Sequence, residues 1–340
     1  MPAFLPFEQK LAAAWPAAHW RDVRVLLAVS GGPDSVSLLR SMDRLRGQGA
    51  GSLAVAHFNH GLRGDRALSD QQFVERLCRS LGVECVLGQA EPPATRGSGE
   101  GLEGALRVAR YEFLASTAER LGARYVATGH TADDQAETIL HHILRGTGLR
   151  GLSGMRRVRP LGSAVTLMRP LLEITRADVI DYLAALEQPY QQDETNRDRT
   201  LMRNRVRHEL LPLLARDYSP AIVESLLRLG ALAGDAQQVI DALAQSLLER
   251  CLVERDAGHV VIDCRALCSQ DRHLVREVFV AAWRRQCWGQ QSMGWTQWNL
   301  LAEMALADEP ADIARQVLPG AITARRNDQQ LWLCASRPSP

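Results

Sequence analysis

The segment VLLAVSGGPDSVSLL, residues 25–39, has the composition of an anion-binding turn. Its apolar run predicts a strand and the amphipathic residues after the glycines predict a helix. Such a strand-to-helix turn directs unpaired backbone N–H groups and the positive end of the helix dipole to one place. Gly31 and Gly32 let the backbone approach a phosphate closely, and Ser30 and Ser35 add hydroxyl donors.

The segment is not a Walker-type phosphate loop, which requires a lysine after its glycines. Lys10 is the only lysine of the chain, so arginines, backbone amides or a metal must serve any phosphate. Pro33 suits the first turn of a helix, where its missing N–H is no loss. Asp34 is then either part of this anion site or an ordinary helix cap.

A second group of acids opens the helix expected at 132–145. Asp134 and Glu137 are three residues apart and Asp133 and Glu137 are four apart, so they share one helix face. Paired carboxylates beside a triphosphate are suitable Mg²⁺ ligands. The alternative is an acidic cluster that only complements the helix dipole.

The net charge of +1 conceals two arginine-rich windows. Seven arginines and one acid lie in 145–176, and six arginines and two acids lie in 197–216. Windows of this kind are typical of phosphate-binding faces, and also of solvated surfaces.

The elements that must position these residues follow from alternating short apolar runs and amphipathic segments. The runs predict strands at 23–29, 53–58, 83–87 and 125–128, and the spacing between them predicts helices at 34–46, 69–81, 102–122 and 132–145. This alternation indicates a doubly wound α/β fold with a mainly parallel sheet. A Pro/Gly/Ser-rich loop is expected at 90–101.

The later part of the chain predicts a helical region and a small α+β C-terminal domain. Helices are expected at 175–187, 201–215 and 219–250, the last as one or two, and strands at 321–325 and 330–334. We expect three parts: an N-terminal domain at 1–216 that carries both groups of residues described above, a helical linker at 217–250 and a small C-terminal domain at 251–340.

The composition narrows the class of protein. At 340 residues with 46% apolar content, the chain is long enough for two or three domains. It has no apolar stretch of membrane-spanning length and no evident secretion signal, so we expect no membrane partner and a cytoplasmic location. Seven cysteines without a CxxC pair fit a reducing compartment.

The motif SGGPDS, residues 30–35, resembles the SGGxDS motif of the PP-loop (N-type) ATP pyrophosphatase family, which has a Rossmann-like fold. This family cleaves ATP between its α and β phosphates, adenylates a substrate and releases pyrophosphate. The resemblance implies that the loop holds pyrophosphate and that Asp34 helps to bind Mg²⁺.

Five segments in this order resemble tRNA(Ile)-lysidine synthetases. They are SGGPDS, HFNHGLRG from His57, LEGALRVARYEFL from residue 102, ATGHTADDQAET from Ala127 and NRDRTLMRNRVRHELLPLL from Asn196. That family adenylates C2 of the wobble cytidine in tRNA(Ile) with a CAU anticodon and then attaches the ε-amine of L-lysine. The chain resembles its short form, which lacks a second C-terminal domain.

The resemblance implies a role for each matching residue. The implied catalytic residues are Asp34, Asp134, Glu137, Arg110, Asn196, Arg203 and Arg207. The implied ATP-binding residues are Ser30, Gly31, Gly32, Pro33, Asp34, Ser35, His57, Arg110, Gly129 and His130. Asp34 and Asp134 are the expected Mg²⁺ ligands, and Asp133 and Glu137 the expected lysine-binding pair. For tRNA we expect Arg145, Arg150, Arg156, Arg157 and Arg205, and the family also suggests a homodimer.

Other functions make different demands on the sequence. A tRNA thiolase requires a persulfide cysteine or a cluster-binding CxxC, and a glutamine-fed amide synthetase requires an amidotransferase nucleophile. A non-catalytic RNA-binding module would not need the acids, yet Asp34, Asp133, Asp134 and Glu137 are all present. Which of Asp133, Asp134 and Glu137 contacts metal and which contacts lysine stays open.

Overall fold

The computed structural model describes residues 4–47, 49–59, 65–89, 100–191, 202–256, 258–290, 292–307 and 315–335. The chain forms two compact units, an N-terminal unit of Met1–Leu232 and a C-terminal unit of Ala233–Pro340. The boundary falls inside one long helix, α10 (Ile222–Cys251). The division into parts ending at 216 and 250 stays a prediction.

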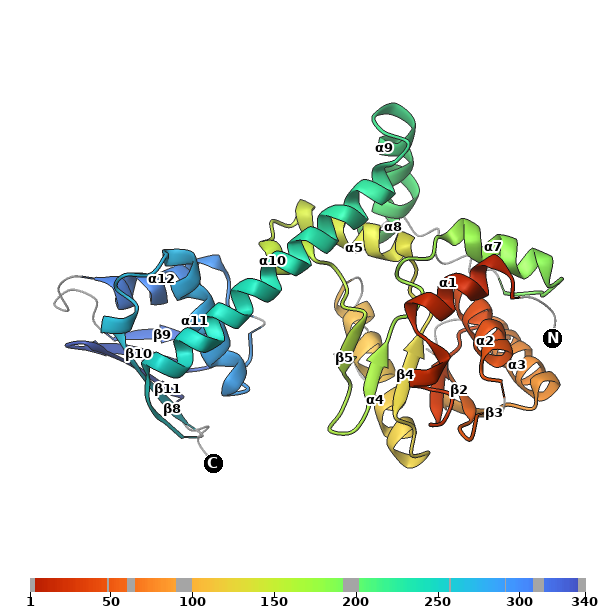
Figure 1. Ribbon diagram of the computed structural model, residues 1–340, viewed down its shortest axis with the longest axis horizontal. Helices are drawn as coiled ribbons and strands as arrows, with labels where there is room; N and C mark the ends of the chain where they lie inside the picture. Colours follow the sequence, from red (N-terminus) through yellow and green to blue (C-terminus); the bar gives the residue numbers. More distant parts are fainter. Residues whose placement is uncertain are drawn as a thin grey trace. The chain divides into compact units, whose positions relative to one another are not determined.

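A six-stranded sheet is the centre of the N-terminal unit, with the strand order β3-β2-β1-β4-β6-β5 (Figure 1). Its strands are β1 (Val25–Ala28), β2 (Leu53–Asn59), β3 (Glu84–Gln89), β4 (Tyr125–Thr128), β5 (Val158–Pro160) and β6 (Thr166–Met168). All neighbours pair in parallel except β5, which runs antiparallel to β6 at one edge. The expected mainly parallel sheet is confirmed.

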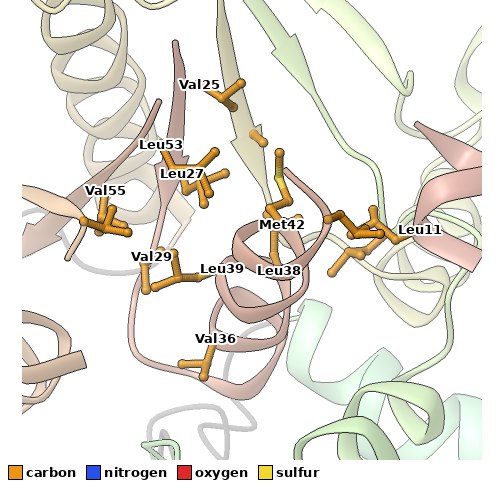
Figure 2. Close-up of a cluster of buried hydrophobic side chains, with 14 of the residues drawn as sticks. Leu11, Val25, Leu27, Val29, Val36, Leu38, Leu39, Met42, Leu53 and Val55 are labelled. Carbon is orange, nitrogen blue, oxygen red and sulfur yellow. The ribbon is translucent and has the colours of Figure 1, made fainter. Parts of the chain in front are cut away.

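Helices cover both faces of this sheet. The helices of this unit are α1 (Pro6–Ala14), α2 (Pro33–Leu45), α3 (Asp65–Leu81), α4 (Glu100–Arg120), α5 (Ala132–Leu144), α6 (Leu149–Leu152), α7 (Arg176–Ala185), α8 (Met202–Arg205) and α9 (Leu211–Asp217), with a 3₁₀ turn η1 (Ala17–His19) and a π-helical turn η3 (Val206–Leu210). Of these, α8, η3 and α9 pack against α5 and not on the sheet. Because successive residues of a strand face opposite sides, Leu27 packs in the cluster with α2 while Leu26 packs in the cluster with α4. Figure 2 shows the first cluster, with Val25, Leu27 and Val55 opposite Leu38 and Leu39 of α2.

The sequence did not predict the β5–β6 pair or helix α1. Each of these two strands has only three residues, so neither shows a period-two pattern that could be distinguished from a loop. The expected helix at 201–215 is present but is divided into α8, η3 and α9. The expected loop at 90–101 lies almost wholly outside the described residues.

The C-terminal unit is a second, antiparallel sheet with its own core. Its strands follow the order β7-β8-β11-β10-β9. They are β7 (Leu252–Arg255), β8 (His259–Asp263), β9 (Gln316–Leu318), β10 (Ile322–Asn327) and β11 (Gln330–Ala335), with helices α11 (Arg272–Arg285) and α12 (Trp295–Leu306) and a 3₁₀ turn η4 (Cys264–Ala266). Trp283 of α11 is fully buried among these elements. The small α+β domain predicted after the helical region is confirmed, and both late strands lie where the sequence placed them.

In the described residues, no helix combines the length and the apolar character that crossing a membrane requires.

A buried carboxylate joins the first helix to the sheet-covering helices. Glu8 of α1 is fully buried and accepts hydrogen bonds from Tyr182 Oη of α7 at 2.9 Å, from the Leu5 N–H at 2.9 Å and from Arg44 of α2. Three donors on one buried carboxylate compensate for the loss of its hydration.

Replacing Glu8 by alanine is therefore expected to lower the free energy of unfolding by about 3–5 kcal/mol, because Arg44 and Tyr182 lose their acceptor. Urea denaturation of both proteins measures this loss. The matched variant Tyr182→Phe removes only one donor and should cost about 1 kcal/mol. Equal losses of unfolding free energy in the two variants would contradict the claim that the Glu8 carboxylate stabilises the protein through several donors at once.

Candidate active site

The SGGPDS turn is held in shape by its own serines. Gly31 has φ 96°, a left-handed conformation that favours glycine, and α2 begins at Pro33 with Gly32 as its cap. Ser35 Oγ donates to the Gly32 carbonyl at 2.9 Å and accepts from the Ser30 N–H at 3.2 Å. These contacts fix the start of α2 against the end of β1, which is the geometry expected of an anion-binding turn.

Gly129, directly after β4, lies against this turn. A Cβ atom on Gly129 would lie 2.8 Å from the Asp34 carbonyl oxygen and 3.0 Å from the Ser35 nitrogen. Only a glycine therefore allows the loops after β1 and β4 to come this close. The sequence-predicted ATP residues of both loops are thus brought together.

Asp34 projects from the first turn of α2 and is paired with Arg176, the first residue of α7. Its Oδ1 atom is buried and has no hydrogen-bond partner among the described residues. Burial raises its pKa most and Asp134 adds to the rise, while Arg176 and Arg207 oppose it, and the resulting pKa is about 6 instead of 3.8. A buried carboxylate oxygen without a partner is a suitable position for a cation ligand.

Asp134 and Glu137 share one face of α5, as their spacing predicts. Asp134 closes a capping box with Thr131, and its Oδ1 accepts from Arg207 Nη2 at 2.7 Å. Glu137 is only 2% exposed and accepts from Arg207 Nη2 at 3.0 Å and from Arg203 Nε at 3.4 Å. The two arginines of the α8–η3 segment thus cover both acids.

The two acids have opposite pKa shifts. Burial raises the pKa of Glu137 although Arg207 and Arg203 oppose it. Burial also acts on Asp134, but the neighbouring His130, the Thr131 N–H and the same two arginines outweigh it and hold the pKa of Asp134 below its usual range. Glu137 is therefore the acid of this pair that more readily takes up a proton.

Asp133 has a different environment. Its Oδ2 accepts from the backbone N–H of Arg176 at 2.7 Å. Arg176 therefore contacts both Asp133 and Asp34, through its backbone and its side chain respectively. The sequence did not identify Arg176 as a site residue, because an arginine at the start of a helix has no distinguishing spacing.

Two histidines at strand ends are neutral at pH 7. Burial lowers the pKa of His57, whose Nδ1 lies 2.9 Å from the Val29 carbonyl oxygen. Burial lowers the pKa of His130 to about 3, helped by Arg169, Arg110 and Arg203, and its Nδ1 lies 2.8 Å from Thr128 Oγ1. Both side chains can exchange hydrogen bonds with a nucleotide without adding charge.

The remaining predicted residues are distributed around this centre. Arg110 lies on α4, with its guanidinium carbon 5.3 Å from the centre of the Tyr111 ring. Arg156 is exposed, Arg157 pairs with Glu173, and Arg205 pairs with Glu209 at 3.7 Å on the surface. Arg145 and Arg150 lie at the end of α5 and in α6. Asn196 lies outside the described residues.

The fold and the phosphate loop place the chain in the class of PP-loop proteins, and a family model described as a PP-loop domain matches residues 6–214. The tRNA(Ile)-lysidine synthase of Rhodopirellula baltica is 32% identical over 336 residues, covering 88% of this chain and 84% of that protein. The tRNA(Ile)-lysidine synthase of a Nostoc species is 33% identical over 259 residues, covering 76% of this chain and 73% of the relative. The chain therefore belongs to the tRNA(Ile)-lysidine synthase family.

Other relatives are longer than this chain. The tRNA(Ile)-lysidine synthase of Geobacter sulfurreducens is 37% identical over 260 residues, which cover 75% of this chain and 54% of that protein. Among solved structures, the U34-tRNA thiolase NcsA from Methanococcus maripaludis has a TM-score of 0.56 at 17% identity, covering 67% of this chain and 78% of the thiolase. This likeness concerns the fold alone.

Proposed function

We propose that the chain catalyses the lysidine synthetase reaction: ATP adenylates C2 of the wobble cytidine in tRNA(Ile) with a CAU anticodon, and the ε-amine of L-lysine then displaces AMP. The observation that carries the proposal is the meeting of three acids with the phosphate loop. Asp34 extends from that loop, and Asp134 is close enough to raise its pKa and shares Arg207 with Glu137.

The residues present fit Mg²⁺ with ATP. Asp34 offers a buried oxygen without a partner, and Asp134 lies close to it. Among the residues described, no cluster of three or more His, Cys, Asp or Glu side chains could hold a metal. This suits Mg²⁺, which commonly takes one or two carboxylates and completes its shell with phosphate oxygens and water. When bound, the ion would neutralise charge on the phosphates.

The protein groups have separate tasks in the two steps. In the first step, the C2 oxygen bonds to the α phosphorus of ATP and pyrophosphate leaves, held by backbone N–H groups of the SGGPDS turn other than Pro33, which has none. In the second step, the lysine amine bonds to C2 and AMP leaves with the oxygen. The amine must lose a proton, and Glu137, whose pKa burial raises, is the acceptor we propose, with Asp133 assisting in binding lysine.

Arg145, Arg150, Arg156, Arg157 and Arg205 are the proposed tRNA contacts outside this centre. Replacing Arg156 and Arg157 together by alanine should weaken tRNA binding about tenfold and reduce its salt dependence, because fewer counterions are released. Filter binding over a range of salt concentrations measures both quantities. An unchanged salt slope would remove these two residues from the interface.

The deciding experiment combines the protein with ATP, Mg²⁺, L-lysine and tRNA(Ile) bearing CAU, followed by mass analysis of the nucleosides. We expect lysine-modified cytidine together with equal amounts of AMP and pyrophosphate. AMP without modified cytidine would show that the RNA substrate is wrong, and thiolated uridine in a sulfur-supplied reaction would favour the thiolase. The proposed homodimer rests on the family resemblance, and sedimentation of the full chain measures it. The cytoplasmic location stays an expectation from the sequence.

A further inference from the structure

An arginine-lined pocket lies beside α4. Its volume is about 610 Å³. The charged and aromatic residues that line it are Arg107, Tyr111, Glu112, Arg156, Arg159 and Arg169. We call this site the Tyr111 pocket. Its four arginines and one glutamate give the lining a charge of about +3.

The guanidinium groups of this pocket surround one phenol ring. The guanidinium carbons of Arg159 and Arg107 lie 4.6 and 5.2 Å from the centre of the Tyr111 ring. Cation–π contacts relieve only part of the repulsion between the arginines. The four arginines around this ring outnumber the single acid Glu112, so a further anion is needed for charge compensation.

Several donors at the pocket lack a partner within the described chain. The buried atoms without a hydrogen-bond acceptor include the Nε atoms of Arg159 and Arg169. Arg169 is only 3% exposed, and its Nη1 donates to the Arg156 carbonyl at 2.6 Å. Buried N–H groups are costly when unpaired, so these donors indicate a missing anionic acceptor.

The pocket adjoins the active site through the sheet. Arg169 directly follows β6, and β6 is parallel to β4, which ends before Gly129 and His130. The carboxyl ends of parallel strands lie at one edge, where ligands of open sheets bind. Arg169 and Arg110 also contribute to the low pKa of His130, which confirms that the pocket and the catalytic loops are close.

We propose that the Tyr111 pocket binds a backbone phosphate of the RNA substrate, next to the nucleotide that is modified. The inference rests on the proposed function, since it assumes an RNA substrate. An RNA phosphodiester suits the pocket better than the triphosphate of ATP because the pocket includes no residue of the SGGPDS turn. Its outer wall is open, with Val108 57% exposed and Arg156 at the surface. Arg107, Arg159 and Arg169 are positioning residues that hold the RNA strand.

The phenol gives the site a distinctive pH response. Burial acts to raise the pKa of Tyr111, but Arg107, Arg110 and Arg169 outweigh it and lower the pKa to about 8. Arg159 of β5 and Glu112 of α4 also face the ring. Above pH 8 the ionised phenol competes with the phosphate for the guanidinium groups, so RNA binding should weaken severalfold between pH 7 and 8.5. Tyr111→Phe should abolish this additional weakening.

The test compares Arg159→Gln with Arg120→Gln, an equal loss of charge at an exposed position of α4 outside the pocket. We expect Arg159→Gln to raise the Kd of the full chain for tRNA about tenfold and to reduce the salt slope by about 0.7–0.9, with an unchanged Kd for ATP. Arg159→Lys should recover part of the affinity, and thermal melting verifies that each variant is folded.

Two outcomes would overturn the proposal. An ATP affinity that falls as much as the tRNA affinity would assign the pocket to the triphosphate. A tRNA affinity equal to that of Arg120→Gln would show that the pocket binds no RNA phosphate. A short oligocytidylate is the second probe: if no lysidine forms in the activity assay but Arg159→Gln still weakens oligocytidylate binding, the proposed function fails while the phosphate site stands.

Discussion

Replacing Asp34 by asparagine is expected to slow AMP release by about 10³-fold or more while tRNA binding changes less than twofold. Asparagine keeps the size of the side chain and removes the charge that would hold a cation on the phosphates. The buried, unpartnered Oδ1 is the atom whose loss of charge matters. AMP release is measured from radiolabelled ATP with saturating lysine and tRNA, and retention of tRNA on a filter gives the binding.

Asp34→Asn should also have a higher free energy of unfolding than the unchanged protein at neutral pH. The pKa of Asp34 is about 6 in the folded protein and 3.8 for an unperturbed group, so between these pH values the folded state holds a proton that the unfolded state has lost. The free energy of unfolding therefore falls as pH rises through this window, by about 3 kcal/mol in total. Asparagine does not ionise and so avoids this loss, although Arg176 loses its charged partner. We therefore expect the free energy of unfolding of the variant at pH 8 to be higher by about 1–2 kcal/mol.

Asp43→Asn is the matched control, because Asp43 lies on the same helix and pairs with Arg46 at 3.2 Å away from the phosphate loop. It should leave AMP release unchanged and alter the free energy of unfolding by less than about 1 kcal/mol. Full turnover by Asp34→Asn would remove Asp34 from the site. An activity loss with a lowered stability at pH 8 would show instead that the carboxylate is needed for folding.

The central sheet could be predicted because its strands are apolar runs buried on both faces. Val25, Leu26 and Leu27 are fully buried in succession, which is typical of a parallel strand and easy to recognise in a sequence. Strand β5 has no such run, since Val158 is 49% exposed and Arg159 and Pro160 are polar or turn-forming, and β6 is only three residues long. The sequence pattern therefore did not predict the edge of the sheet that carries the Tyr111 pocket.

The site was predicted where one motif carries several functional residues. The turn at 30–35 and the acids at 133–137 are local patterns, and the fold only had to bring two loops together. Arg169 and Arg176 were missed because their partners are distant in sequence: Arg176 is 142 residues from Asp34. A buried arginine immediately after an apolar strand, as in TLMRPLL, is the signal that could have identified Arg169.

Arg207 holds two buried acids, so its replacement by methionine should be the most destabilising change in the site. Methionine preserves the apolar stem but leaves Glu137, which is 2% exposed, and Asp134 with only the longer 3.4 Å contacts from Arg203. Breaking such a buried arrangement costs about 3–5 kcal/mol of unfolding free energy. Urea denaturation at pH 8 measures the loss.

The loss should depend on pH in a direction fixed by Glu137. Burial already raises the pKa of Glu137 while Arg207 lowers it, so removing Arg207 raises this pKa further above the unfolded value of 4.5. In the variant, the folded state then binds a proton that the unfolded state lacks, over the range between 4.5 and the new pKa. The destabilisation by Arg207→Met should thus be small near pH 5 and grow as pH rises.

A double-mutant cycle separates this charge effect from lost packing. If the destabilisation arises from an uncompensated carboxylate at position 137, adding Glu137→Gln to Arg207→Met should restore much of the lost stability and flatten its pH dependence. The coupling energy should then reach about 1–3 kcal/mol at pH 8. Additive effects, or the same loss at pH 5 and pH 8, would instead mean that Arg207 stabilises the protein through its packing in the α8–η3 segment. Arg207 would then have no part in setting the protonation state of the acid that we propose receives the proton of lysine.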